Sequence, residues 1–223
     1  MLYSQMSRDI RIDFAHIDKL YQHNDALERK AQILMRKKAI YEYRHHLLES
    51  ISNIALDTSN FAQTEYGKPY LNIHAKISPK LAFNHSHSQN FYALATSSKL
   101  DDIGVDVEEI NRKVRFDALA KHAFHSNEYR TWQELDKDLN YWFRVWTSKE
   151  AILKASGLGI RMSLNELDIG LHPLHHGGKF EHRNLGEFGY QNFNLQGCIL
   201  TVAWRIKHSC QSFAFPKIEI VQH

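Results

Sequence analysis

Two acidic side chains in the segment IGVDVEEI, residues 103–110, are spaced so that they could share a metal ion. The segment alternates as a half-buried β-strand does, and a strand places Gly104, Asp106 and Glu108 on one face. Side chains on the same face of a strand lie roughly 6.5 to 7 Å apart at the backbone. Carboxylate oxygens are the ligands that Mg²⁺ prefers. A strand with a merely solvated polar face would show the same pattern, so the segment alone leaves both interpretations open.

A third carboxylate belongs to a predicted helix, WFRVWTSKEAILKA at residues 142–155. At the helical period Glu150 lies roughly 40° from Trp146, inside an apolar stripe. An unpaired charge is costly to bury, so Glu150 is expected to meet a metal, a base or a cleft. Lys154 lies four residues further on, in the orientation that favours a Glu–Lys pair. A simple surface ion pair is the alternative interpretation.

The charges are unevenly distributed along the chain. Residues 101–109 hold five acidic side chains and no basic one. Residues 28–44 hold two acidic side chains and six basic ones, which are Arg29, Lys30, Arg36, Lys37, Lys38 and Arg44. A basic segment suits a polyanion and an acidic cluster suits a divalent cation. Together the two segments indicate a phosphorylated ligand bound with Mg²⁺.

The elements that must position these residues follow from the periodicity. Apolar residues recur at helical spacing over about 25–56 and again over 114–155. Residues 81–97 are typical of a β-hairpin, and residues 193–206 form the clearest strand of the last third. The His-rich stretch 171–178 contains Pro173 and a Gly pair, and is therefore expected to be a loop.

The two halves of the chain share a faint similarity. A Gly-Lys-Pro turn at 67–69 precedes AFNHSHSQNFYALAT, and Gly157-Leu158-Gly159 precedes NFNLQGCILTVAW. In each half a helix comes first and strands follow. An internal duplication of this kind would place a binding cleft between two similar subdomains.

Composition excludes several classes of protein. The 223 residues are 43% hydrophobic and 24% charged, which is typical of an ordinary globular protein rather than a disordered or fibrous one. No apolar run approaches the roughly 18 to 20 residues of a transmembrane helix, and the N-terminus lacks the apolar core of a signal peptide. We therefore expect a cytoplasmic protein without a membrane partner. Cys198 and Cys210 are too few for a disulfide framework and are expected to be buried or bystander thiols.

Four motifs, in this order and spacing, resemble those of the 4′-phosphopantetheinyl transferases, in particular their two-subdomain, Sfp-like branch. They are GKP at 67–69, FNHSHS at 83–88, IGVDVEE at 103–109 and WTSKEAILK at 146–154. The resemblance covers about residues 28–168. It implies an α+β fold in which a pseudo-twofold axis relates two similar subdomains, each a helix packed on a small antiparallel sheet. We expect the subdomains to span residues 1–110 and 111–223.

The same resemblance implies an enzyme that transfers the 4′-phosphopantetheine group from coenzyme A to a serine of an apo acyl or peptidyl carrier protein. The reaction would depend on Mg²⁺ and release adenosine 3′,5′-bisphosphate. The resemblance implies that Asp106, Glu108 and Glu150 bind the metal. Glu150 is also the candidate general base, and Lys154 would supply positive charge to the phosphates.

The remaining predicted contacts concern coenzyme A, again by resemblance. Lys68 and Pro69 would border the adenine and the phosphates, and Ser86 with His87 would hold the phosphate end. Arg44 is predicted to meet the 3′-phosphate, and Lys37 and Lys38 belong either to that contact or to a solvated basic face. His85 departs from the family pattern and receives no role. An internal duplication would supply both halves of the cleft, so a monomer is expected.

Two other functional classes share some of these sequence features. Fifteen histidines suggest zinc, but the spacing of pairs such as His45–His46 matches no zinc-ligand motif. The basic helix at 28–44 could belong to a nucleic-acid-binding module. Against this, the acidic residues at 101–109 would repel a polyanion, and the net charge of +3 is small. We therefore expect no nucleic-acid partner.

Overall fold

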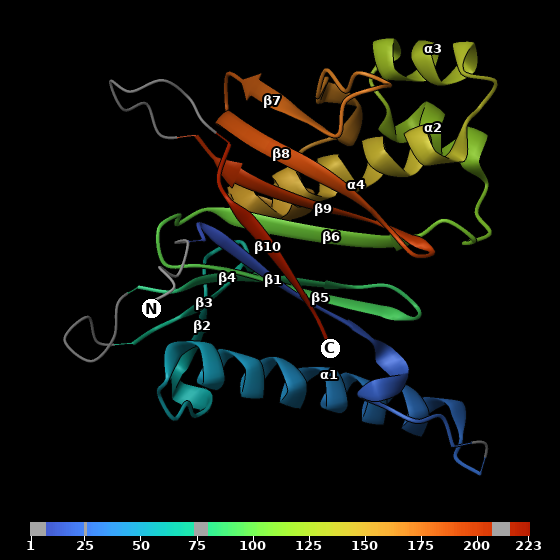
Figure 1. Cartoon of the computed structure of the whole chain (residues 1–223). Coiled ribbons are helices and arrows are strands. Elements are labelled where there is room, and N and C mark those ends of the chain that lie inside the picture. Colours follow the sequence, from blue (N-terminus) through green and yellow to red (C-terminus); the bar gives the residue numbers. More distant parts are fainter. Residues whose placement is uncertain (1–7, 25, 74–79, 207–214) are drawn as a thin grey trace, which may run out of the picture.

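The computed structural model describes residues 8–24, 26–73, 80–206 and 215–223. Two four-stranded sheets lie face to face, with a long helix on the outer face of each (Figure 1). The first sheet has the strand order β10-β1-β5-β4 and is covered by α1, and the second has the order β6-β9-β8-β7 and is covered by α4. This α+β arrangement confirms the predicted fold class.

The strands of the first sheet are β1 (Ile10–His16), β4 (Ala82–His87), β5 (Phe91–Ser97) and β10 (Ile218–Gln222). Those of the second are β6 (Ile103–Glu109), β7 (Gly177–His182), β8 (Gly186–Leu195) and β9 (Cys198–Arg205). β2 (Phe61–Gln63) and β3 (Pro69–Leu71) form a separate antiparallel pair. Neighbouring strands are antiparallel except β1 and β10, which are parallel.

Period-two alternation explains how the four layers meet. Val105 and Val107 of β6 join the cluster between the two sheets, together with Ile12 of β1. Gly104 and Asp106 therefore face the opposite way, toward α4. In β5 the alternate residues Tyr92 and Leu94 pack toward α1. Because layers cover both of their faces, β5 and β6 are buried along nearly their whole length.

The helices begin and end where the sequence chemistry directs. They are α1 (Arg29–Ser52), α2 (Phe116–Ala123), α3 (Ser126–Glu134) and α4 (Leu139–Ser156). α1 contains no Gly or Pro and ends at Asn53, which adopts the left-handed conformation. Asp138 caps the N-terminus of α4 by accepting a hydrogen bond from Tyr141 N, and the left-handed Gly157 caps its C-terminus.

The structure can be compared with several elements and residues that the sequence predicted. The predicted hairpin, the strand at 103–109 and the long first helix are all present. The buried residues of α1 are Ile40, Leu47 and Leu48, whereas Leu34 in its first half is 69% exposed. Cys198 is a free, buried thiol, and Cys210 lies outside the described residues. Among the helices described, none combines the length and the apolarity needed to cross a membrane.

The strand connections cross the predicted boundary at residue 110. β6 precedes the boundary but pairs with β9 in the second sheet, whereas β10 lies at the end of the chain and pairs with β1 in the first sheet. Each sheet therefore contains one strand from the other half of the sequence. The division into residues 1–110 and 111–223 stays a prediction.

Candidate active site

The site begins with an unusually close approach between β6 and α4. A Cβ atom added to Gly104 would lie 2.1 Å from Ala151 O and 2.4 Å from Ala155 N, so no other residue fits without moving the helix. The next residue on the same face of β6 is Asp106. Gly104 thus sets the distance at which the acidic strand meets the helix that carries Glu150 and Lys154.

Ser86, Asp106 and Lys154 form a closed triangle of polar contacts. Lys154 Nζ donates to Asp106 Oδ1 at 2.7 Å and to Ser86 Oγ at 2.9 Å, and Ser86 Oγ donates to the same Asp106 oxygen at 2.8 Å. These residues come from β4, β6 and α4, so the contact joins both sheets and a helix. Lys154, predicted as the helical partner of Glu150, therefore binds Asp106. The structure brings these three predicted site residues together.

The two other predicted carboxylates are destabilised as anions. Burial raises the pKa of Glu150, and the negative charge of Asp106 raises it further. Burial and Asp106 also raise the pKa of Glu108, and Arg112 opposes this shift with an ion pair of 2.6 Å to Glu108 Oε1. Both shifts show negative charge crowded into a partly dehydrated space. Such crowding favours a bound cation.

The donor chemistry of the three carboxylates fits a hard divalent ion, although no ready-made cage is present. Asp106 Oδ2 is buried and has no hydrogen-bond partner, so one carboxylate oxygen is free to bind a cation. Within the part of the chain that the structure describes, no three His, Cys, Asp or Glu side chains converge as a metal cluster. Lys154 and Arg112 instead neutralise two of the carboxylates. The shared metal site of Asp106, Glu108 and Glu150 stays a prediction.

Lys68 and Pro69 line a cavity of about 500 Å³ together with Phe83 and Asp102. Lys68 is turned inward, and its Nζ donates to Ala155 O at 2.6 Å. Burial lowers the pKa of this lysine, and the nearby Asp102 opposes that effect. Lys68 thereby ties the turn before β3 to the last turn of α4, next to Lys154. Its predicted contact with coenzyme A stays a prediction.

His87 of β4 and Arg44 of α1 are two predicted site residues that do not belong to the triangle. His87 lines a cavity of about 690 Å³ with Arg36 and Glu108. Burial lowers the pKa of His87, and Arg36 lowers it further. Arg44 Nη1 lies 3.0 Å from His85 Nε2, and its guanidinium lies over the ring of Tyr41 at 5.0 Å. The structure thus places Arg44 apart from the triangle.

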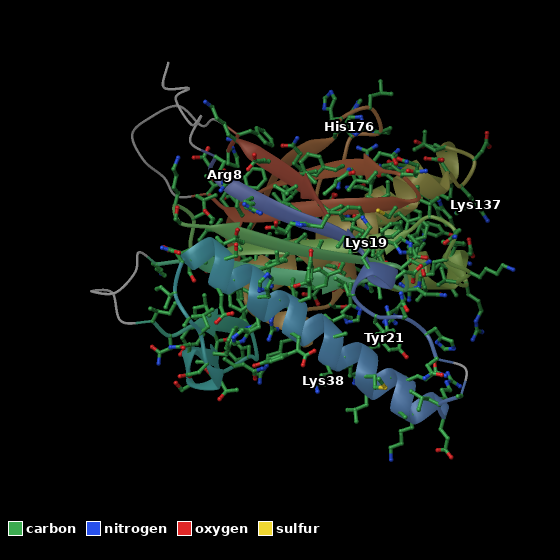
Figure 2. All side chains as sticks on the ribbon, turned by 60° about the horizontal axis from the view of Figure 1, so that its bottom comes forward. Arg8, Lys19, Tyr21, Lys38, Lys137 and His176 are labelled. Atoms are coloured by element: carbon green, nitrogen blue, oxygen red, sulfur yellow. The ribbon has the colours of Figure 1, made fainter. Side chains whose placement is uncertain are left out.

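The predicted basic residues Lys37 and Lys38 are exposed on α1. Figure 2 shows Lys38 on the outer side of the helix, away from the sheets. Lys38 lies 3.7 Å from Glu42, one turn further along the helix. For both lysines, the contact with coenzyme A and the solvated face stay alternative predictions.

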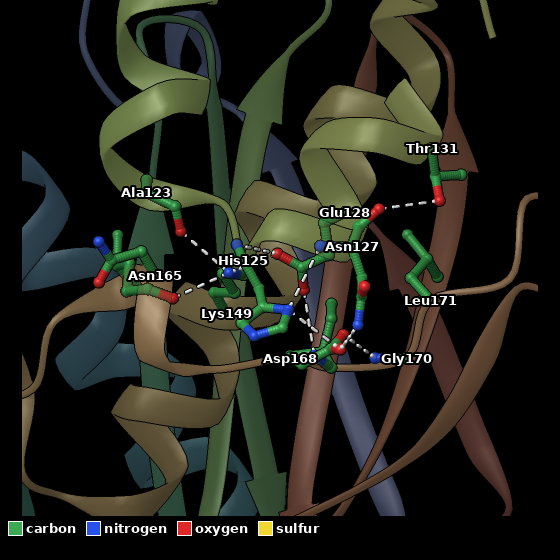
Figure 3. A network of polar contacts seen from close by, with 12 residues as sticks. Ala123, His125, Asn127, Glu128, Thr131, Lys149, Asn165, Asp168, Gly170 and Leu171 are labelled. Atoms are coloured by element: carbon green, nitrogen blue, oxygen red, sulfur yellow. Dashed lines mark hydrogen bonds and ion pairs between the residues drawn. The ribbon is translucent and has the colours of Figure 1, made fainter. Parts of the chain in front are cut away.

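Glu150 itself opens onto a third cavity, of about 580 Å³, lined by Lys154, Leu153, Met162 and Leu164. A buried charge network supports its wall (Figure 3). Lys149, 1% exposed, is ion-paired with Glu128 at 2.5 Å and donates to the carbonyl oxygens of Ala123 and Leu164. Because every donor of this ammonium is satisfied, the network fixes the segment beside Glu150 to α2 and α3.

Comparison with known proteins identifies the part of the chain that builds much of this site. The family model of the 4′-phosphopantetheinyl transferase superfamily matches residues 102–203. This segment is therefore similar to the members of that superfamily. The matched segment contains four of the predicted site residues, Asp106, Glu108, Glu150 and Lys154. The other five, Arg44, Lys68, Pro69, Ser86 and His87, precede it.

Individual members of the superfamily are similar over comparable lengths. The 4′-phosphopantetheinyl transferase Sfp of Bacillus subtilis is 32% identical over 121 residues, which cover 52% of this chain and 50% of the relative. The transferase HetI of a Nostoc species is 41% identical over 95 residues, covering 42% of this chain and 39% of the relative. The transferase gsp of Aneurinibacillus migulanus is 31% identical over 131 residues, covering 56% and 49%. The chain thus spans about half the length of the curated relatives it matches, and the predicted resemblance is confirmed.

The sequence analysis does not identify three residues that hold this site in place. The sequence places Gly104 on a strand face, but nothing in the sequence alone gives the distance between this strand and α4. Arg112 was not considered as the partner of Glu108, although four residues separate them. Lys149 precedes Glu150 in the apolar helix, and a lysine between buried neighbours could have signalled a buried ion pair.

Proposed function

We propose that the chain is a 4′-phosphopantetheinyl transferase that moves the phosphopantetheine arm of coenzyme A onto a serine hydroxyl of an apo acyl or peptidyl carrier protein. In this reaction the serine oxygen forms a bond to the β-phosphorus, and the bond from that phosphorus to the departing adenosine 3′,5′-bisphosphate breaks. The observation that carries the proposal is the triangle of Ser86, Asp106 and Lys154 beside Glu150. Asp106 and Lys154 of this triangle lie in the segment matched to the superfamily, and Ser86 precedes that segment.

Mg²⁺ is the metal proposed for this site. Asp106, Glu108 and Glu150 would hold it, and the partnerless Asp106 Oδ2 supports the assignment. When bound, the ion would stabilise the negative charge of the pyrophosphate. Lys154 would then release Asp106 and direct its ammonium toward the phosphates as a point charge. A cation would also relieve the mutual repulsion that raises the pKa values of Glu108 and Glu150.

Glu150 is the proposed general base. Its carboxylate lines a cavity with apolar walls, where burial raises its pKa and makes it a better proton acceptor than an ordinary glutamate. The proton of the carrier serine would pass to Glu150 as the serine oxygen attacks. Lys149 supports this role indirectly, because it holds Leu164 in the wall of the same cavity.

Coenzyme A is proposed to run across the three cavities that surround the triangle. The cavity with Lys68, Pro69 and Phe83 has the mixed polar and apolar lining that an adenine needs. Ser86 and His87 would contact the phosphates, and Arg44 would meet the 3′-phosphate after exchanging its contact with His85. A cytoplasmic location and a monomeric state are further parts of this proposal.

Mass spectrometry of apo carrier proteins incubated with coenzyme A and Mg²⁺ tests the proposal. We expect each accepted carrier to gain the mass of one phosphopantetheine arm, and the Asp106→Asn variant to transfer far less. Glu134→Gln, an exposed change on α3, serves as the control and is expected to retain full transfer. The absence of a mass gain on acyl and peptidyl carriers alike would refute the proposed function.

A further inference from the structure

The two sheets are joined at one edge by side chains rather than by a backbone ladder. β4 ends the first sheet and β6 begins the second, and the two strands contact each other. Three alternate residues of one chain segment, Asn84, Ser86 and Ser88, each form a hydrogen bond to β6. Asn84 Oδ1 accepts from Val105 N at 2.9 Å, and Ser86 Oγ donates to Asp106. Ser88 Oγ donates to Glu109 Oε1 at 2.9 Å.

The outermost of these bonds belongs to a larger set made by Glu109. Its Oε1 atom also accepts from Asn90 N at 2.5 Å, and its Oε2 atom accepts from Asn90 Nδ2 at 3.0 Å. Glu109 is 5% exposed, so a buried carboxylate receives three donors from the turn between β4 and β5. If the hairpin end were not held against β6, water would bind these three donors instead. The bonds to Glu109 therefore fix where the hairpin end lies.

α1 holds the same turn from its other side. Arg36 Nη2 donates to Ser88 O and to Gln89 O, both at 2.7 Å. The turn is thus hydrogen-bonded both to the guanidinium of Arg36 on α1 and to the carboxylate of Glu109 on the second sheet. His87 immediately precedes the turn and lines the same cavity as Glu108. A shift of the turn would move His87 and Ser86 relative to Asp106 and Glu108.

We propose that Glu109 is a positioning residue that holds the end of the β4–β5 hairpin against β6, and so sets the place of Ser86 and His87 in the coenzyme A site. The effect on coenzyme A rests on the proposed function. The grip on the hairpin stands on the three hydrogen bonds alone. Glu109 lines the same cavity as His87 and Glu108, but both of its carboxylate oxygens accept hydrogen bonds from the turn. It therefore acts through the turn, and we assign it no contact with substrate.

Two substitutions at this position separate bonding from charge. Glu109→Ala removes all three acceptor contacts. Glu109→Gln keeps an oxygen that accepts from Ser88 Oγ and Asn90 N. Its NH₂ group can donate to Asn90 Oδ1 once the side-chain amide of Asn90 has flipped. We expect Glu109→Ala to weaken coenzyme A binding about tenfold in calorimetry, with kcat reduced less than about threefold. Glu109→Gln should restore binding to within about threefold of the wild type.

Amide hydrogen exchange provides a readout that needs no activity. Exchange at residues 88–91 should be faster in Glu109→Ala and near the wild-type rate in Glu109→Gln. Asn90→Ala changes only the turn, and it replaces Glu109→Ala in this test if that variant does not fold. We expect its exchange rates at residues 88–91 to lie between those of the wild type and those expected for Glu109→Ala. Glu49→Ala is the matched control, because Glu49 Oε1 accepts from Leu56 N at the far end of α1. We expect it to leave coenzyme A binding unchanged.

The outcomes keep the two proposals apart. Failure of the wild type to load any carrier would refute the proposed function, while the exchange rates would still test the grip of Glu109 on the hairpin. Unchanged exchange at residues 88–91 in Glu109→Ala or, failing that, in Asn90→Ala would overturn the positioning role. A glutamine variant as impaired as the alanine variant would overturn it too, because charge rather than bonding would then be what matters.

Discussion

At the scale of single residues, the site is dominated by acidic side chains that are partly buried away from water. Glu108 and Glu150 have raised pKa values, chiefly because they are buried and also because Asp106 is near. Asp106 is stabilised by Lys154 and Ser86 at one oxygen only. Folding does not need this crowding, since apolar or amide groups would fill the same space at a lower electrostatic cost. The crowding is therefore best explained by function.

Replacing Glu150 by Gln should separate function from stability. The amide cannot accept a proton from serine at neutral pH, so kcat for carrier loading should fall about 10²- to 10⁴-fold. Removing a charge that burial disfavours should leave the thermal midpoint unchanged or slightly higher. Steady-state loading kinetics and calorimetric unfolding check the two halves of this prediction. Full activity in the variant would remove Glu150 from the mechanism.

His85 should make the folded state sensitive to acid. Burial, aided by Arg44, lowers the pKa of His85 to about 3, whereas an unfolded histidine titrates near 6.5. Between these values the unfolded chain binds a proton that the folded chain does not, so stability falls as the pH falls from about 6.5 toward 3. His85→Gln keeps an acceptor for Arg44 without titrating. Between pH 7.5 and 5, the wild type should lose up to about 2 kcal/mol more than this variant in urea unfolding. Parallel losses would contradict the assignment.

At the scale of elements, periodicity predicted what is local. The hairpin at 81–97 and the strand at 103–109 follow from alternation that each segment carries by itself. Helical periodicity over 114–155 was also correct, although the structure divides it into α2, α3 and α4. Asp136 and Lys137 have positive φ angles between α3 and α4, a conformation that periodicity does not signal.

Contacts between elements could not be predicted in the same way. The carboxylates and Lys154 were named from motifs, but the bond between Lys154 and Asp106 spans 48 residues and depends on how β6 meets α4. The inward turn of Lys68 and the pairing of Arg44 with His85 likewise depend on tertiary packing. Motif resemblance thus supplied the identities of the site residues, and the structure supplied their partners.

Gly104 is the position at which element packing can be tested. Gly104→Ala would drive a methyl group into the backbone of α4 at Ala151 and Ala155, and backbone atoms cannot rotate away. We expect a loss of about 2 to 4 kcal/mol in the free energy of unfolding and a large loss of transfer activity. Ala93→Gly, in the cluster between the sheets, provides a size-change control that spares α4. An unaltered unfolding free energy in Gly104→Ala would show that β6 and α4 lie further apart than described.

At the scale of the whole molecule, the strand exchange joins both halves of the chain. β6 runs beside β9 over seven residue pairs, from Ile103–Trp204 to Glu109–Cys198, and β10 runs beside β1 over five. The apolar cluster between the sheets draws on both, with Ile10 and Ala93 from one sheet and Val105 and Leu200 from the other. Neither sheet can be completed from one half of the sequence. A site that spans the two sheets consequently inherits a fixed geometry.

This architecture predicts that the intact chain unfolds in a single transition, which its own chromophores can report. All four tryptophans, Trp132, Trp142, Trp146 and Trp204, belong to α3, α4 and β9, so their fluorescence follows the second sheet and its helices. Hydrogen exchange of α1, β4 and β5 follows the first sheet. Because removing either sheet would expose the apolar cluster between them, both signals should change at the same urea concentration, within error. Two separated midpoints would mean that the subdomains are independent, and the Ser86–Asp106–Lys154 triangle would then open before the protein unfolds.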